Sequence, residues 1–208
     1  MRKISLIELV QDFLSGGDAP AEIKGRYHEN IIANHIALAY NKIIFQTWLE
    51  GKNYNDYSAL GSWAKNHLLN IVSNTVALPY PPVQLPNNMG ILQVAAGTDL
   101  NNTFAYRETN ANSVFNELEV GSVSTKPTFY LEVNNGAGIN SHVLKLALVP
   151  DGVTTVTVKM LVPFDQIDDF ETISIPAGKE DIILQYVIEL MSKKLPEDKT
   201  HDGNPKQR

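Results

Sequence analysis

The chain contains no cysteine among its 208 residues. Disulfide bonds, thiolate metal sites and cysteine nucleophiles are therefore excluded. Its five histidines include no pair at positions i and i+4, so no helical metal-binding pair is expected. A transmembrane run is also missing, and the apolar start of the chain is broken by Glu8, Gln11 and Asp12, unlike a signal peptide. We therefore expect a cytosol-like compartment.

Clusters of basic residues are missing as well. The net charge is −6, and residues 81–208 carry the whole acidic excess, with sixteen acidic against ten basic side chains. Several lysines or arginines on one face are needed to neutralise a run of phosphates. The sequence therefore disfavours tight binding of nucleic acid.

The remaining polar motifs do not form a recognisable catalytic or metal site. The acidic run from Asp165 to Glu171 lacks the glycine and the terminal glutamate spacing of a calcium loop, which favours a solvated or partner-facing loop. The glycine-rich segment 134–141 lies between two expected strands and has no helix after it, so it predicts a hairpin loop and disfavours a phosphate site. We expect no catalytic residues, no cofactor and no metal.

The central feature of the sequence is a proline-rich stretch at 76–90, which contains Pro79, Pro81, Pro82 and Pro86. Each proline fixes its own φ and favours extended geometry in the residue before it, so no helix is expected here. Gly90 marks a turn into a strand that begins near Ile91. Because the stretch is too apolar for a solvated linker, we predict a packed, extended crossover between a helical half and a β-rich half.

Helical spacing of apolar residues predicts helices over 3–15, from about residue 20 to Glu50 with Gly51 ending it, over 56–73, and from Lys179 to Leu195. In the second of these, apolar residues from Ile23 to Trp48 are expected to cover one broad face. The domain organisation expected is a helical segment at 1–75, the crossover at 76–90, a β domain at 91–176, a C-terminal helix at 177–195 and a polar tail at 196–208.

Alternating apolar residues predict strands over 90–95, 103–107, 113–120, 128–133, 142–149 and 153–162. The Pro150-Asp151-Gly152 sequence predicts a hairpin turn that pairs the last two strands. We expect these strands to form an antiparallel sheet or sandwich. The fold class expected is therefore α+β, with an N-terminal helical layer, a central antiparallel sheet or sandwich, a C-terminal helix and an extended tail.

The tail at 196–208 is too polar to pack on the core of its own subunit. We expect it to dock on another subunit or protein. The residues predicted to make this contact are Pro196, Asp198, His201, Asp202, Asn204 and Arg208.

Three short patterns together resemble one family. They are Leu-Pro at 78–79 and 85–86 followed by Gly-Ile at 90–91, Ile175-Pro176 before the last helix, and the ending PEDKTHDGN at 196–204. These patterns and the order of the segments resemble the structural ring (head–tail connector) proteins of crAss-like tailed bacteriophages, over most of residues 56–204. The resemblance implies a virion protein without enzymatic activity, assembled in the host cytoplasm. It would form a closed ring, as a dodecamer, below the portal and beside neighbouring tail ring proteins, and duplex DNA would pass through it without tight binding.

The residues alone are compatible with two other functions. A carbohydrate- or protein-binding β module with a helical anchor would need an exposed flat platform of aromatic side chains, formed by Tyr54, Tyr57, Tyr80, Phe104 and Tyr106. A hydrolase would need two convergent carboxylates with a raised pKa, such as Glu117 and Glu119, which are more simply explained as a solvent-facing strand.

Overall fold

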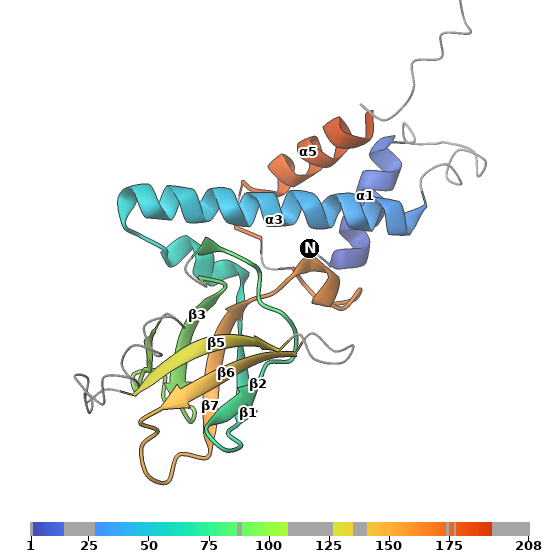
Figure 1. Cartoon of the computed structure of the whole chain (residues 1–208). Coiled ribbons are helices and arrows are strands. Elements are labelled where there is room, and N and C mark those ends of the chain that lie inside the picture. Colours follow the sequence, from blue (N-terminus) through green and yellow to red (C-terminus); the bar gives the residue numbers. More distant parts are fainter. Residues whose placement is uncertain are drawn as a thin grey trace, which may run out of the picture. The chain divides into compact units, whose positions relative to one another are not determined.

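The computed structural model describes residues 2–14, 28–86, 89–107, 127–134, 141–173, 175–176 and 178–192. The chain divides into two compact units, one formed by Met1–Ile43 with Asp168–Arg208 and the other by Ile44–Ile167. The first unit is helical and the second is built mainly of strands (Figure 1). The expected α+β fold class, with N-terminal helices, antiparallel strands and a C-terminal helix, is confirmed.

The first unit contains α1 (Lys3–Leu14), the first part of α3 (Glu29–Tyr54) and α5 (Glu180–Ser192). The helices expected at the two ends of the chain are therefore confirmed within the described residues. Contacts join α1 to α5. Leu6 and Val10 on α1, and Ile183 and Val187 on α5, are fully buried at i, i+4 spacing, the period of one helix face.

The long helix α3 continues to Tyr54, past the glycine that was expected to end it. Gly51 lies inside the helix, and its carbonyl oxygen accepts a hydrogen bond from the Asp56 amide at 2.9 Å. Asn55, at a φ of +52°, takes the left-handed position that ends many helices. The prediction was wrong because asparagine, like glycine, tolerates this conformation.

The second unit contains two sheets. In the three-stranded sheet, β1 (Ala64–Asn70) and β3 (Ile91–Ala96) flank β7 (Thr155–Leu161), and both pairs are antiparallel. The four-stranded sheet has the order β2 (Thr75–Ala77), β6 (Ser141–Ala147), β5 (Thr128–Asn134) and β4 (Ala105–Tyr106). The expected strands at 90–95, 128–133, 142–149 and 153–162 are confirmed, the one at 103–107 is reduced to β4, and the one at 113–120 lies outside the described residues.

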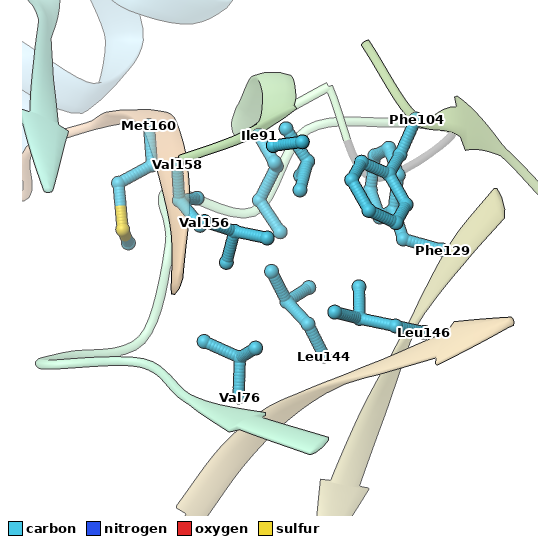
Figure 2. Close-up of a cluster of buried hydrophobic side chains, with 11 residues drawn as sticks. Val76, Ile91, Phe104, Phe129, Leu144, Leu146, Val156, Val158 and Met160 are labelled. Atoms are coloured by element: carbon cyan, nitrogen blue, oxygen red, sulfur yellow. The ribbon is translucent and has the colours of Figure 1, made fainter. Parts of the chain in front are cut away.

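The two sheets enclose one apolar core, as in a sandwich. Figure 2 shows Leu144 and Leu146 of β6 pointing towards Val156 and Val158 of β7. The Phe104 amide donates to the Val94 carbonyl at 2.8 Å, and the chain continues from there into β4, which lies in the other sheet. This link joins one edge of the three-stranded sheet to the four-stranded sheet, so that edge is not left open.

The helix expected over 56–73 does not form. Residues Ser58–Trp63 make a short 3-10 helix, η1, and β1 follows it at once. Leu60 and Trp63 are both buried, which is the i, i+3 spacing that a 3-10 turn satisfies. From Ala64 onward the chain pairs with all seven residues of β7. Pairing with a distant strand therefore overrides the local helical spacing.

The turn at Pro150-Asp151-Gly152 forms, with the Val153 amide donating to the Pro150 carbonyl at 3.2 Å. It does not make the expected hairpin, because β6 pairs with β5 and β2, whereas β7 pairs with β1 and β3. The turn instead leads the chain from one sheet to the other. Leu148, just after β6, has a φ of +57°, and this left-handed residue directs the chain out of the four-stranded sheet.

Leu148 should tolerate replacement by a residue that suits the left-handed region. Its side chain is half exposed, so little packing is lost. Leucine costs roughly 1–2 kcal/mol in this conformation, whereas the short polar side chain of asparagine lowers that cost by hydrogen-bonding locally. We expect Leu148→Asn to raise the free energy of unfolding by up to about 1 kcal/mol in urea titrations. Leu100→Asn is the matched control, since Leu100 is also an exposed leucine but has no positive φ. A loss of stability in Leu148→Asn would contradict this interpretation.

Candidate functional site

The tail residues expected to bind a partner, from Pro196 to Arg208, lie outside the described residues. Glu117 and Glu119, the carboxylates considered for a hydrolase, also lie outside them. Within the described ranges, no group of three histidine, aspartate or glutamate side chains could hold a metal ion. The described features that could form a site are the histidines, the acidic run, the crossover and the exposed apolar side chains.

The histidines on and before α3 are used in local contacts. The His35 ring bonds through Nδ1 to the Ile31 carbonyl oxygen at 2.7 Å, and this side chain is buried. His28 accepts a hydrogen bond at Nδ1 from the Asn30 amide at 3.3 Å, at the start of the helix. The two imidazoles have separate local roles.

The acidic run contacts the N-terminal helix. Lys3 Nζ lies 3.1 Å from Asp169 Oδ1, and the Lys3 amide donates to the Glu171 carbonyl at 3.1 Å. The Ile4 amide donates to the Asp169 carbonyl at 2.9 Å, and Arg2 forms a bridge with Thr172. The loop that was expected to be solvated or to face a partner thus holds the first turn of α1 through backbone and ionic contacts.

The crossover is extended and packed, as expected. No helix occurs between residues 78 and 85, and Val83 and Leu85 are buried. Gly90 is needed because a Cβ at this position would overlap the Val83 carbonyl oxygen. The Gly90 carbonyl accepts a hydrogen bond from the Leu161 amide at 2.8 Å, so the same residue fixes the crossover against β7.

A polar contact ties the crossover to β1. His67 Nε2 lies 2.7 Å from the Tyr80 hydroxyl, and the two rings meet edge to face with centroids 5.3 Å apart. Because this pair is partly buried, it supplies both packing and a hydrogen bond between segments thirteen residues apart. It holds Tyr80, one of the five aromatics considered for an exposed platform, in an internal contact.

Tyr80→Phe should lower the free energy of unfolding of the chain. The substitution keeps the edge-to-face contact and removes the hydrogen bond to His67, which is worth about 1 kcal/mol. Chemical denaturation followed by circular dichroism measures the change. Tyr57→Phe, which removes a hydroxyl outside this contact, is the control, and equal stability of the two variants would show that the His67 contact contributes nothing.

A surface groove of about 220 Å³ lies where the crossover passes the ends of β5 and β6. We call it the crossover groove, and it is lined by Pro82, Val83, Gln84, Leu85, Gly90, Leu131, Val133 and His142. His142 is held in place by its strand. It pairs with Val133 across the sheet, and its carbonyl oxygen accepts a hydrogen bond from the Leu78 amide at 3.0 Å. Its Nδ1 is buried and has no hydrogen-bond partner within the described part of the chain.

The helix α3 carries apolar side chains on two faces. Ile32, Ile36 and Ile43 are buried on one face. The opposite face bears the α3 stripe, formed by the exposed residues Ile31, Leu38, Phe45 and Leu49. Their separations of seven, seven and four residues place them within about 40° of one another around the helix. The expectation of one broad buried face is therefore wrong for Ile31 and Leu38, which are 47% and 60% exposed.

The aromatic platform required for the carbohydrate-binding alternative is not formed. Phe104 is 5% exposed and belongs to the core shown in Figure 2. Tyr54 is 83% exposed, whereas Tyr57, Tyr80 and Tyr106 are only partly exposed. Tyr106 instead contacts Phe129 with ring centroids 5.5 Å apart. One of the five side chains is thus unavailable, and two others are used in ring contacts inside the unit.

The carboxyl of Asp56 has a pKa below its ordinary range. The pKa of this carboxyl is lowered because it accepts hydrogen bonds from the Ser58 backbone and side chain. It is exposed two residues before η1, and the bond from the Ser58 amide forms a local Asx turn.

No protein-family model matches the sequence, and no curated protein is significantly similar to it. Among the described residues, no helix combines the length and apolar character needed to cross a membrane.

Proposed function

We propose that the chain is a structural protein without enzymatic activity that assembles with copies of itself into a closed ring. The observation that carries the proposal is the α3 stripe. A helix that is apolar on two faces is normally buried on both, because each exposed apolar surface costs free energy in water. The stripe therefore supports a contact with another protein chain along α3.

The surroundings of the stripe have the character of an interface rim. Asn34, Asn41 and Lys42 are exposed beside it on the same helix. Protein interfaces typically place apolar anchors at the centre and polar side chains around them. A stable interface buries roughly 800 Å² on each partner, so four side chains can form only its centre.

The resemblance to the ring proteins of crAss-like phages suggests where in a virion this assembly would lie. In that setting the ring belongs to the virion, between the portal and the neighbouring tail ring proteins, and the portal's symmetry implies twelve copies. Duplex DNA would pass through the ring. The acidic excess after residue 81 supports passage without tight binding, because like charges repel the phosphates.

Electron microscopy of the purified full-length chain, alone and mixed with a phage portal protein, tests the proposal. We expect closed rings of uniform diameter, because heterologous contacts between copies close when the rotation between neighbours divides a full turn. Single small particles in both samples, at micromolar concentration, would contradict the proposed function.

The polar tail gives a second prediction about assembly. Deleting residues 196–208 should leave the melting temperature nearly unchanged, because these residues have little apolar surface to bury. The truncated chain should nevertheless form rings or partner complexes less readily, since the charged side chains of the deleted tail would set the register of docking. Sedimentation of the two chains at matched concentrations measures the difference. Equal assembly would show that the tail is not a contact.

A further inference from the structure

The strand β1 forms an open edge of the three-stranded sheet. It pairs with β7 along its whole length, and no strand among the described residues pairs with its other side. The opposite edge of the same sheet, at β3, is closed by the Phe104 amide, which donates to the Val94 carbonyl. An unpaired edge presents a row of backbone N–H and C=O groups to which another strand can add.

The pairing of β1 with β7 identifies the residues whose backbone faces this open side. Residues of an antiparallel strand alternate between bonding to the partner strand and pointing away from it. The Val162 amide donates to the Trp63 carbonyl at 3.3 Å, just before β1. The Ile71 amide donates to the Thr154 carbonyl at 2.9 Å, just after it, so the odd-numbered residues between them bond to β7. The even-numbered residues point outward, and the exposed ones are Asn66, Leu68 and Asn70.

These three residues form an edge that is accessible and unprotected. Leu68 is 58% exposed, and the backbone groups of all three residues have no hydrogen-bond partner in the part of the chain that the structure describes. Proteins usually protect an edge strand with proline, lysine or a β-bulge. Residues 66–70 contain neither proline nor lysine, and their register with β7 is regular. The edge is therefore suited to pair with another strand.

The edge is also complementary to itself. The sequence Asn-His-Leu-Leu-Asn at 66–70 places one asparagine two residues before Leu68 and another two residues after it. When a second β1 lies antiparallel with Leu68 opposite Leu68, each Asn66 faces an Asn70. The three resulting pairs each exchange two backbone hydrogen bonds. Their side chains share one face of the sheet, so the leucines contact each other and the asparagine amides can both donate and accept across the pair.

We propose that β1 of one copy pairs in this register with β1 of a second copy of this chain, joining their three-stranded sheets into one continuous sheet. The contact uses the same surface on both copies, so it is isologous and has a two-fold axis. An isologous contact joins copies in pairs. It is therefore additional to the heterologous contacts of the proposed ring and does not depend on them.

The size of the contact sets its expected strength. Three residue pairs form a small contact compared with the roughly 800 Å² per partner of a stable interface, so we expect a dissociation constant on the order of 100 μM to 1 mM. Copies at micromolar concentration therefore remain separate at this edge unless another contact holds them together.

Disulfide crosslinking tests both the contact and its register, because the chain has no cysteine of its own. Opposite residues of a hydrogen-bonded pair have Cα atoms about 5.5 Å apart, a separation that a disulfide can bridge. The full-length chain carrying Leu68→Cys is oxidised at a concentration near the expected dissociation constant, with and without Leu38→Glu on the α3 stripe. We expect a disulfide-linked dimer in both cases. An equimolar mixture of Asn66→Cys and Asn70→Cys chains should also give a dimer.

Two controls separate the specific pair from random collision. Val72 is 69% exposed and lies beyond the end of β1, and its two copies would be about 26 Å apart in this register. Val72→Cys should therefore give about a tenth of the dimer or less. Asn66→Cys without Asn70→Cys should give a similarly low yield, since the two copies of Asn66 are about 13 Å apart. Equal yields from Leu68→Cys and Val72→Cys would overturn the proposal.

A charge at the centre of the pair provides a second test. Leu68→Lys leaves an exposed, solvated side chain in the free copy but places two ammonium groups directly opposite each other in the pair, which destabilises it. Added to both the Asn66→Cys and the Asn70→Cys chains, Leu68→Lys should lower the yield of dimer about tenfold. Val72→Lys adds the same charge outside the pair and should leave the yield nearly unchanged. An undiminished yield with Leu68→Lys would overturn the proposal.

The outcomes distinguish this contact from the proposed function. Rings that form in the unchanged chain while Leu68→Cys gives no dimer would overturn the β1 pairing and leave the ring proposal standing. Dimers of Leu68→Cys in the presence of Leu38→Glu, with no rings in the unchanged chain, would overturn the ring and leave the β1 pairing standing.

Discussion

Gly90→Ala should lower the free energy of unfolding of the second unit by about 3 kcal/mol, the upper part of the range for overpacking substitutions. The added Cβ would overlap the Val83 carbonyl oxygen, and backbone atoms cannot rotate away as a side chain can. Relief of the overlap requires the crossover to move away from β7, which also strains the hydrogen bond from the Leu161 amide to Gly90. Since small domains are stable by only about 5–15 kcal/mol, the loss should be evident in thermal and urea unfolding.

Gly61→Ala is the matched control for this substitution. At Gly61 the nearest atom to an added Cβ is the flexible end of Lys159, at 3.4 Å. We expect its stability to change by no more than about 0.5 kcal/mol. If Gly90→Ala were equally mild, the close approach of the crossover to Gly90 would not exist in the protein.

Leu38→Glu should dissociate the assembly without unfolding the subunit. Leu38 lies in the middle of the α3 stripe and is 60% exposed, so a glutamate there remains solvated in the free chain. In an interface the same carboxylate would be buried without a partner, which costs several kcal/mol. A loss of about 3 kcal/mol raises a dissociation constant on the order of a hundredfold.

Gln46→Glu introduces the same charge on the same helix and serves as the control. Gln46 is exposed about 80° away from Leu38 around the helix axis, outside the stripe. We expect its assembly to change little, and both variants to melt at the temperature of the unchanged chain. Loss of assembly in both variants would indicate a general effect of charge, and loss in neither would remove the stripe from the interface.

Local patterns in the sequence predicted those elements that are stabilised by their own spacing. The amphipathic ends of the chain became α1 and α5, and the alternating stretches around Leu144 and Val158 became β6 and β7. Gly90 was recognised as a turn before a strand, but its close approach to Val83 could not be read from the sequence, because it depends on how a distant segment is placed.

The predictions of secondary structure were wrong where pairing with a distant strand overrides the local preference of the sequence. Residues 64–70 have apolar positions compatible with a helix, yet seven cross-strand pairs with β7 make them a strand. The turn at 150–152 was identified, but a turn signal does not specify which sheets its flanking strands join. The single left-handed residue Leu148 at the end of β6 carries no sequence signal, because leucine is rarely found in that conformation.

The candidate surfaces could not be predicted from the sequence either. Ile31 and Leu38 were expected on the buried face of their helix, since an apolar residue looks the same whether it packs inside a subunit or between subunits. The crossover groove could not be predicted either, because Val83, Leu131 and His142 are distant in sequence and meet only in the folded chain.

The central claim is that the chain assembles with itself through the α3 stripe. Native mass spectrometry of the full-length chain and of Leu38→Glu, at micromolar concentration, tests it most directly. We expect one dominant closed oligomer for the unchanged chain, with twelve copies if the portal symmetry applies, and a monomer for Leu38→Glu. A monomer for both chains, alone and with a portal protein present, would contradict it.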